Sequence, residues 1–254
     1  MNLGLQLYGP IACGKMDLAE MFRGLKEVGF GMVEPCITLD GKMNNPSFWS
    51  MPECEKWFPL LKELGLEVIS CHVASENFDD SIPEICRLAD EFGVKQFVVG
   101  TGELSQAAIE ERSALYRKIA DILKDHNAEL LIHNGKPDIA AKIQGRTAYE
   151  YMVDCCLGKV GMQFDSGWCA RGGEDPMEFI NKNQGRIKSF HYKDFNMNND
   201  TDVDVCIGDG TLDNPGFKKF ASSKGIPQFV DADTYSDVIS DAKKSYQYLQ
   251  KVEN

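Results

Sequence analysis

The sequence predicts an α/β protein built as a single (β/α)8 TIM barrel over residues 1–254. Eight short apolar runs rich in Val, Ile, Leu and Phe alternate with longer stretches of helical period, which is typical of parallel strands joined by helices. Glycine stands at or just after several helical stretches, where the chain turns back into a strand. The length of 254 residues and the hydrophobic content of 43% suit one barrel with one buried core.

The apolar runs define the expected strands of this barrel. They cover residues 3–8, 31–35, 66–72, 95–101, 128–133, 160–165, 186–192 and 227–231. The expected helices cover residues 17–28, 52–64, 82–92, 106–125, 147–156, 176–183, 214–223 and 237–251. The helix-ending glycines are Gly29, Gly65, Gly93 and Gly225. An open, doubly wound sheet is the structural alternative, but no strand is followed by GxGxxG or by a GxxxxGKS/T motif.

Charge and cysteine content limit the partners and the location. With 39 acidic against 27 basic residues the net charge is -12, which repels phosphate backbones and anionic lipids, so we expect neither nucleic acid nor a membrane as partner. Nine cysteines without a CxxC pair are interpreted as reduced thiols. The first ten residues carry no basic leader segment, and no apolar run is long enough to span a bilayer. We therefore expect a cytoplasmic protein and leave open whether it is a homo-oligomer.

Polar residues gather at the carboxyl ends of the predicted strands, where barrels of this kind carry their active sites. The residues at or just after these ends are Glu34, His72, His133, Asn134, Asp165, His191, Lys193, Asp231 and Asp233. Three of the four histidines stand there, whereas His126 lies at a helix C-terminus, which favours histidine whatever the function. A single histidine is more often structural than a ligand. Three together indicate a functional site.

Imidazoles and carboxylates that meet in one concave site bind divalent cations through mixed nitrogen and oxygen ligands. We predict that Asp165, His191 and Asp231 hold a Mn, Mg, Co or Zn ion, with His133 as the fourth ligand. Polar strand ends are also a general sign of a binding site in a barrel, so a site without metal is the alternative interpretation.

Two further segments bear on the site. Trp168 follows Asp165 closely, and its ring suits a wall against a sugar as well as it suits packing in the core. Residues 196–211 are polar and contain Gly208-Asp209-Gly210, but they lack the central glycine and closing glutamate of a calcium-binding EF-hand loop. We expect a solvated loop after the seventh strand.

The chain resembles the xylose-isomerase-like sugar phosphate isomerases and epimerases over nearly its whole length. The motifs that carry the resemblance are LGLQLY at 3–8, VE at 33–34, ISCH at 69–72, IHN at 132–134, QFDSGW at 163–168, GEDP at 173–176, GRIKSFHYKD at 185–194 and IGDGTLD at 207–213. The segment at 185–194 is the most distinctive of them. This family shares its barrel with inosose dehydratases and abasic-site endonucleases.

The resemblance implies a divalent metal held by a polar group on the fifth strand, Asp on the sixth, His on the seventh and Glu on the eighth. The last three positions correspond here to Asp165, His191 and Asp231. Asp231 is one methylene shorter than the expected Glu, roughly 1.5 Å. On the fifth strand the motif HNHxxEF of one subgroup reads HNGKPDI at 133–139, so Gly135 replaces its second histidine and Asp138 its glutamate. These departures leave a reshaped, weakened or empty site as alternatives.

Two more positions bear on the kind of reaction. The His and the Arg that would mark a ketose 3-epimerase are here Trp168 and Met197, which argues against that specific activity.

Our first functional hypothesis is an isomerase or epimerase that moves a proton next to a carbonyl of a sugar or cyclitol. The reaction passes through an enediolate whose charge a divalent ion stabilises. We assign His72 and Lys193 to position or protonate substrate oxygens, and Glu34 to orient His72 or to act as the base. The expected substrate contacts are Gln6, Asn134, Trp168 and Asp233.

Three alternatives remain. A dehydratase or lyase acting on inosose or a 3-keto-sugar uses the same groups, and the pair Lys193-Asp194 favours it over an epimerase. A non-catalytic sugar-binding barrel follows from the departures on the fifth and eighth strands. An abasic-site phosphodiesterase ranks last, because it needs a basic groove and a multinuclear zinc cluster with more histidines than the four present.

Overall fold

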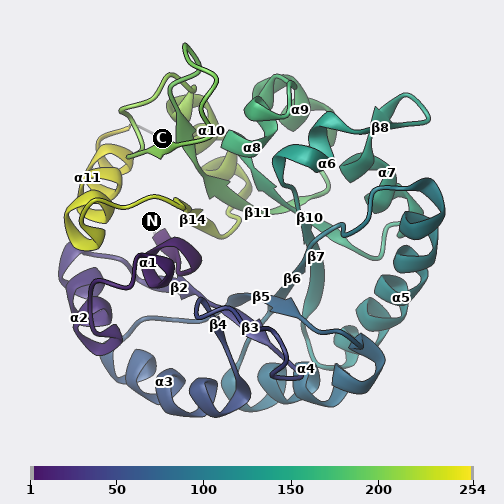
Figure 1. The fold of residues 1–254 in the computed structure, drawn as a ribbon, viewed down its shortest axis with the longest axis horizontal. Coiled ribbons are helices and arrows are strands. Elements are labelled where there is room, and N and C mark those ends of the chain that lie inside the picture. The colour runs from purple at the N-terminus through teal and green to yellow at the C-terminus, as the bar shows by residue number, and fades with distance from the viewer. Residues whose placement is uncertain (1–2, 253–254) are drawn as a thin grey trace.

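The computed structural model describes residues 3–252 and has a ring of helices around a curled parallel sheet, as predicted (Figure 1). The strands that form the barrel are β1 (Leu3–Gln6), β2 (Met32–Glu34), β3 (Cys36–Thr38), β5 (Ser70–Ala74), β6 (Gln96–Val99), β7 (Glu129–His133), β10 (Gly161–Asp165), β11 (Ile187–Tyr192) and β14 (Gln228–Val230). Neighbouring strands pair in parallel around the ring except at the junction of β2 and β3, and β1 pairs with both β2 and β14. The pairing of the last strand with the first closes the barrel.

The second strand of the barrel is split at Pro35. Its first part, β2, pairs with β1, and its second part, β3, pairs with β5. Proline has no backbone N–H to donate, so it interrupts the ladder at this point. The Pro35 carbonyl still accepts from the His72 N–H at 2.9 Å. Because Glu34 is the last residue before this interruption, its side chain is fixed at the place where two strands meet.

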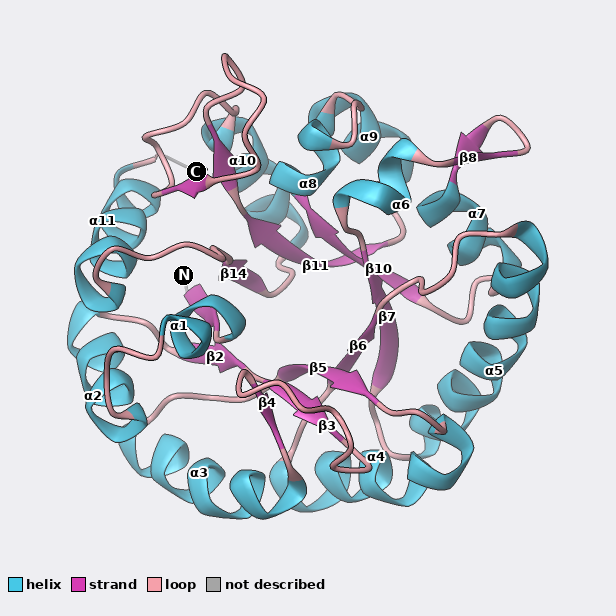
Figure 2. Cartoon of the chain, in the orientation of Figure 1, coloured by secondary structure: helices cyan, strands magenta, loops and turns pink. Residues whose placement is uncertain are grey.

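Long helices cover the outside of the barrel, as Figure 2 shows. They are α2 (Leu18–Val28), α3 (Met51–Leu64), α4 (Phe78–Phe92), α5 (Gln106–Asp125), α7 (Ala148–Cys155), α9 (Pro176–Asn183), α10 (Asn214–Lys224) and α11 (Val238–Lys251). Three short helices follow strand ends directly: α1 (Tyr8–Cys13), α6 (Lys136–Ala140) and α8 (Ser166–Arg171). The remaining short strands are β4 (Phe48–Trp49), β8 (Lys142–Ile143), β9 (Arg146–Thr147), β12 (Asp194–Phe195) and β13 (Asp204–Val205).

Most predicted boundaries agree with the structure within two residues, and two differ more. Helix α4 begins at Phe78 and not at residue 82, because the Asn77 side chain caps it by accepting from the Asp79 N–H at 3.1 Å. The third barrel strand is Ser70–Ala74, although the apolar run begins at Leu66, which packs in the core before the strand starts. The fourth is Gln96–Val99, two residues shorter than predicted at its carboxyl end.

Alternation along β10 and β11 separates the core from the site. Phe164 of β10 stacks on Phe179 of α9 with ring centroids 5.1 Å apart, so it faces the helices. Its neighbours Gln163 and Asp165 therefore point to the inside of the barrel. The register pairs Asp165 with His191, which brings the polar ends of the two strands level.

Within residues 3–252, no helix is both long and apolar enough to cross a bilayer.

Candidate active site

His191 lies at the centre of the polar cluster inside the barrel. Its Nε2 is 2.7 Å from Glu34 Oε2, and its Nδ1 is 3.0 Å from Asp231 Oδ2. All three side chains are buried. Burial would lower the pKa of His191, but the two carboxylates outweigh it and raise the pKa to about 10. In the metal-free protein this imidazole is therefore a cation held between two anions.

Glu34 is a buried carboxylate surrounded by donors. Its Oε1 accepts from Ser70 Oγ at 2.5 Å and from Gln163 Nε2 at 2.7 Å. Its Oε2 accepts from His191 and lies 3.3 Å from His72 Nε2. Although burial works against ionisation, the charge of His191 and the hydrogen bonds from His191 and His72 hold the pKa of Glu34 well below its usual range. Such a carboxylate is a fixed anion that orients its donors, and it is poorly suited to take up a proton.

His133 and Asp165 face each other without forming a hydrogen bond. His133 Nε2 and Asp165 Oδ2 are 3.7 Å apart, and both atoms are buried without a partner in the described part of the chain. The other carboxylate oxygen of Asp165 caps α8 by accepting from the Trp168 N–H at 2.7 Å. Burial, with repulsion from His191 adding to it, lowers the pKa of His133 well below its usual range, so its ring is neutral at pH 7. Burial raises the pKa of Asp165 to about 7.

The donor atoms of this cluster fit a divalent cation. One group of side chains places one nitrogen or oxygen ligand atom each within 4.8 Å of the others: His133, Asp165, His191 and Asp231. Two of these atoms have no other partner in the described residues, and a mixed set of imidazole and carboxylate suits Mn, Mg or Zn. His191 would bind through Nδ1, since Glu34 accepts from its Nε2, which is the usual support for a metal-bound histidine.

Asp231 reaches the cluster despite its short side chain. Its Oδ2 lies 3.0 Å from His191 Nδ1, and its Oδ1 lies 3.4 Å from Lys193 Nζ. Burial works against ionisation, but Lys193 and His191 hold the pKa of Asp231 well below its usual range. Asp138, which occupies the glutamate position of the fifth-strand motif, lies outside the cluster. It bonds to Thr101 and accepts from the Gly135 N–H at 2.6 Å.

A second group within the same distance is formed by Glu34, His72 and His191. It is less suited to an ion, because both oxygens of Glu34 already accept hydrogen bonds. The His72 side chain is 20% exposed, and its ring centroid lies 5.1 Å from that of His133. His72 and His133, which is 17% exposed, are thus the histidines of the cluster that solvent reaches.

Lys193 is a fully buried cation among carboxylates. Its Nζ is 2.8 Å from Asp233, 3.4 Å from Asp231 and 3.8 Å from Asp204. Burial would lower the pKa of Lys193, but these carboxylates raise it above its usual range. The ammonium also lies 5.2 Å from the centre of the Trp168 ring. Lys193 therefore stays charged and fixes the positions of Asp231 and Asp233.

Sequence reasoning missed Asp204, which reaches the site from the loop after β11. This loop is largely exposed, as expected for a solvated loop, but the expectation is wrong for Asp204, which is 5% exposed. The antiparallel pairing of β12 with β13 carries it inward, and its Oδ2 accepts from the Asp233 N–H at 2.5 Å. Asp194 anchors the same loop by accepting from the N–H groups of Gly208 and Gly210.

The residues expected to contact the substrate divide into two pairs. Gln6 and Asn134 are buried, and their side chains form hydrogen bonds within the protein. The Gln6 side chain accepts from the Tyr8 N–H. The Asn134 side chain accepts from the Asp165 N–H at 2.9 Å and donates to the Asp165 carbonyl at 3.1 Å. Trp168 is half-buried, and the Asp233 side chain is 39% exposed. His126, which was assigned no chemistry, pairs with Asp90 at 2.9 Å on the outside of the barrel.

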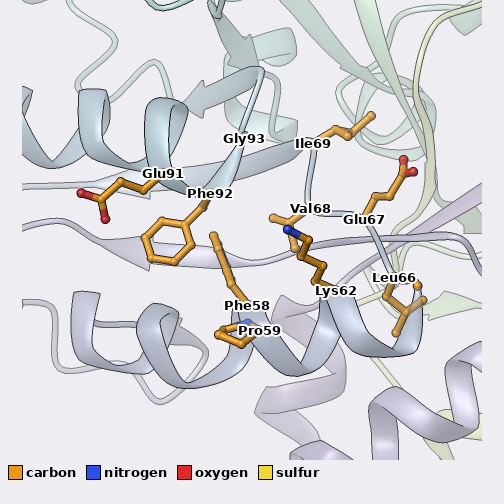
Figure 3. A pocket seen from close by; sticks show the side chains of 11 residues that line it. Phe58, Pro59, Lys62, Leu66, Glu67, Val68, Ile69, Glu91, Phe92 and Gly93 are labelled. Carbon is orange, nitrogen blue, oxygen red and sulfur yellow. The ribbon is translucent and has the colours of Figure 1, made fainter.

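A separate cavity lies elsewhere in the described part of the chain. About 720 Å³ in volume, it opens beside α3 and the segment that leads into β5, at the opposite ends of the strands (Figure 3). It is lined mainly by apolar side chains and backbone, including Phe58, Pro59, Leu66 and Phe92. None of the residues of the polar cluster lines it. We therefore place the chemistry at the polar cluster and not at this cavity.

Comparison with known proteins identifies the family and agrees with the fold. The family described as xylose isomerase-like TIM barrel matches residues 22–252, whereas no curated protein matches the chain. A sugar phosphate isomerase/epimerase from Parabacteroides distasonis has a TM-score of 0.78 at 20% identity, covering 99% of this chain and 95% of that chain. A probable 3-DHS dehydratase from Bacillus anthracis has a TM-score of 0.73 at 14% identity, covering 100% of both chains. A xylose isomerase-like TIM barrel protein from Mycobacterium smegmatis in complex with magnesium has a TM-score of 0.69 at 16% identity, covering 99% and 95%.

Proposed function

The chain belongs to the xylose isomerase-like TIM barrel family, and we propose that it is a metal-dependent isomerase or epimerase of a sugar or cyclitol. The observation that carries this proposal is the pair His133 Nε2 and Asp165 Oδ2, which are buried, 3.7 Å apart and without a hydrogen-bond partner among residues 3–252. Leaving two such polar atoms unsatisfied is unfavourable, and a shared cation would satisfy both. Beside them, Asp231 and His191 complete a ligand set of two imidazoles and two carboxylates.

The residues of the chain would divide the work as follows. When bound, a divalent ion supplies a Lewis acid that stabilises negative charge on the carbonyl and hydroxyl oxygens of the substrate. His72 takes the proton from the carbon next to the carbonyl, since its imidazole borders the cluster and is reached by solvent. In an isomerisation it delivers the proton to the former carbonyl carbon, whereas in an epimerisation a second acid would return a proton to the same carbon from the opposite face. Glu34 holds His191 and His72 in place from behind.

The outer side chains would bind the sugar. Trp168 offers an apolar ring face, and Asp233 offers an exposed carboxylate oriented by Lys193 at 2.8 Å. Lys193 itself is fully buried, so it acts by keeping Asp231 ionised and Asp233 oriented. Gln6 and Asn134 would contribute indirectly, because their side chains already brace the Tyr8 and Asp165 backbone.

A dehydratase or lyase acting on an inosose or 3-keto-sugar is the second candidate. It would begin with the same proton abstraction and then expel a hydroxyl group as water. The observation that favours it is Asp233, a partly exposed carboxyl group whose pKa is raised to about 6 by burial and by the neighbouring Asp231. A carboxyl group near this pKa can give a proton to the departing hydroxyl.

Deuterium exchange tests the proposed chemistry. A panel of ketoses, inososes and 3-keto-glycosides is incubated with the protein in heavy water containing Mg²⁺ or Mn²⁺, and the carbon next to the carbonyl is followed by NMR. We expect deuterium to enter at that carbon, and to stop entering after chelation of the metal. The matched variants are Asp165→Asn, which should lose exchange, and Asp175→Asn, which changes an exposed helix cap and should keep it.

The outcomes separate the candidates. Exchange with recovery of an isomer supports the isomerase or epimerase, and exchange with loss of water supports the lyase. Turnover without exchange would contradict proton abstraction by a base that solvent reaches, as proposed for His72. Sugar binding without turnover or metal would leave a non-catalytic sugar-binding barrel.

A further inference from the structure

Gln163 connects three parts of the polar cluster from the middle of β10. Its side chain is fully buried, and it points to the inside of the barrel. Its Nε2 lies 2.7 Å from Glu34 Oε1 and 3.3 Å from Ser189 Oγ. Its Oε1 lies 2.7 Å from His72 Nε2. The amide is therefore a bridge between the buried carboxylate and the solvent-reached histidine.

The bridge has only one consistent direction. Glu34 already receives Ser70 Oγ on Oε1 and His191 Nε2 on Oε2, and a carboxylate oxygen can only accept, so the amide group that faces Oε1 must be the NH2. The carbonyl oxygen of Gln163 then faces His72, and an oxygen can only accept. His72 must donate from Nε2. The second neighbour of this nitrogen, Glu34 Oε2 at 3.3 Å, is also an acceptor and agrees with this direction.

A neutral histidine with its proton on Nε2 has its lone pair on Nδ1. Nδ1 of His72 makes no hydrogen bond to residues 3–252, and it is not among the buried atoms left without a partner. It is thus the ring nitrogen that solvent or a substrate can reach. The outward face of His72 is an acceptor.

We propose that Gln163 is a positioning residue that fixes His72 as the Nε2–H tautomer, so that Nδ1 accepts the proton taken from the substrate. This rests on the function proposed above for its catalytic meaning, whereas the tautomer itself is a property of the protein alone. Ser70 and Ser189 support the arrangement, because Ser70 bonds to the same oxygen of Glu34 and Ser189 accepts from the same amide.

Nitrogen NMR of the whole protein labelled with 15N-histidine tests the tautomer directly. The chain has only four histidines, and the signals of His72 are those that vanish in a His72→Gln variant. In the Mg²⁺-loaded and in the metal-free wild type we expect a protonated, pyrrole-type Nε2 and an unprotonated, pyridine-type Nδ1. A proton on Nδ1, alone or together with one on Nε2, would overturn the proposal.

Two substitutions separate the acceptor role of Gln163 from packing. Gln163→Met removes the acceptor at similar volume, and we expect the tautomer ratio of His72 to move about tenfold toward Nδ1–H, the effect of losing one buried hydrogen bond. Gln163→Glu places a carboxyl group 2.7 Å from Glu34, so it must carry its proton toward Glu34; its other oxygen then still accepts from His72 and should preserve the Nε2–H form. A matched control is Gln96→Met, at a buried glutamine of β6 that bonds to Glu129 and to the Lys188 carbonyl. An unchanged His72 spectrum in Gln163→Met would contradict the assignment.

Kinetics provides the second measurement. Once a substrate is turned over, Gln163→Met should lower kcat about tenfold while metal affinity stays unchanged, whereas a loss of metal would show a structural effect on the ligand set. If the wild type exchanges no deuterium with any sugar, the proposed function fails, but the tautomer measured by NMR still decides the role of Gln163.

Discussion

Asp165→Asn should make the metal-free protein more stable and at the same time remove its response to metal. In the wild type the Asp165 carboxylate is fully buried, and one of its oxygens faces His133 Nε2 without a hydrogen bond. Asparagine keeps an oxygen for the Trp168 N–H and turns an NH2 group toward the unpartnered nitrogen of His133. The substitution therefore removes a buried charge and supplies a missing donor.

The size and sign of this effect follow from the pKa of Asp165. Burial raises it from 3.8 to about 7, and at about 1.4 kcal/mol per pKa unit the difference corresponds to about 4 kcal/mol. Between these pH values the folded protein binds more protons than the unfolded chain, so the free energy of unfolding falls as pH rises from about 4 to about 7. In the asparagine variant the free energy of unfolding does not fall in this way, because the titrating carboxyl group is absent. The two proteins should be similar near pH 4 and differ by up to about 4 kcal/mol at pH 8.

Urea unfolding from pH 4 to pH 8, with chelator and with a divalent ion, measures both effects. With the ion at about one hundred times its Kd, the wild type should gain about 2.7 kcal/mol and the Asp165→Asn variant none. Asp175→Asn is the control, since Asp175 caps α9 through the Glu178 N–H at 2.8 Å but is exposed, and it should leave the pH profile unchanged. Parallel pH profiles of wild type and Asp165→Asn would refute the buried-charge reasoning. Equal gains from the ion would refute the role of Asp165 as a ligand.

Three other substitutions test neighbouring parts of the site. His191→Ala leaves two buried carboxylates without their partner, so the free energy of unfolding in urea should fall by about 3–5 kcal/mol. Calorimetry should also detect no metal binding by this variant. An unchanged unfolding midpoint would contradict this reasoning. Gly167→Ala would place a Cβ 2.7 Å from the Lys193 carbonyl oxygen, which should lower the free energy of unfolding by about 1–3 kcal/mol in the same assay; a neutral result would mean that the backbone yields there. Trp168→Ala should weaken sugar binding about tenfold in calorimetry and leave metal affinity unchanged, and equal sugar affinity would remove this ring from the binding surface.

The fold was predictable because its signals are local and repeated. The bounds of α5 and α9 agree with the sequence prediction, since each begins after a capping residue, Ser105 or Asp175, and carries a clear helical period. The start of α4 was not predictable from its proline, because a proline is expected in the first turn of a helix and Pro83 lies further inside. The split of the second strand at Pro35 depends on the partners on both sides, which the sequence does not name.

The candidate site was predictable where function follows strand ends. The rule that barrel chemistry lies at the carboxyl ends of strands led to the four proposed metal ligands, which the structure brings within reach of one another. Gln163 was missed because it is neutral and lies within a strand, although it is two residues from Asp165 and so shares its inward face. Asp204 could not be found by such a rule. It reaches Lys193 through a hairpin in a loop, and nothing in the local sequence fixes that pairing.

The adjacent residues Lys193 and Asp194, at the end of the seventh barrel strand, contact different parts of the protein. The lysine joins the carboxylates of the site, while the Asp194 carboxylate accepts from Gly208, Gly210, Leu212 and Asn214 and so holds the following loop from inside. A loop held by its own buried carboxylate keeps its conformation when its exposed tip changes. The tip can therefore be replaced, by evolution or by design, to change which molecules enter, provided that Asp194 and Asp204 are kept. The strand that bears His191 stays unchanged in such a replacement.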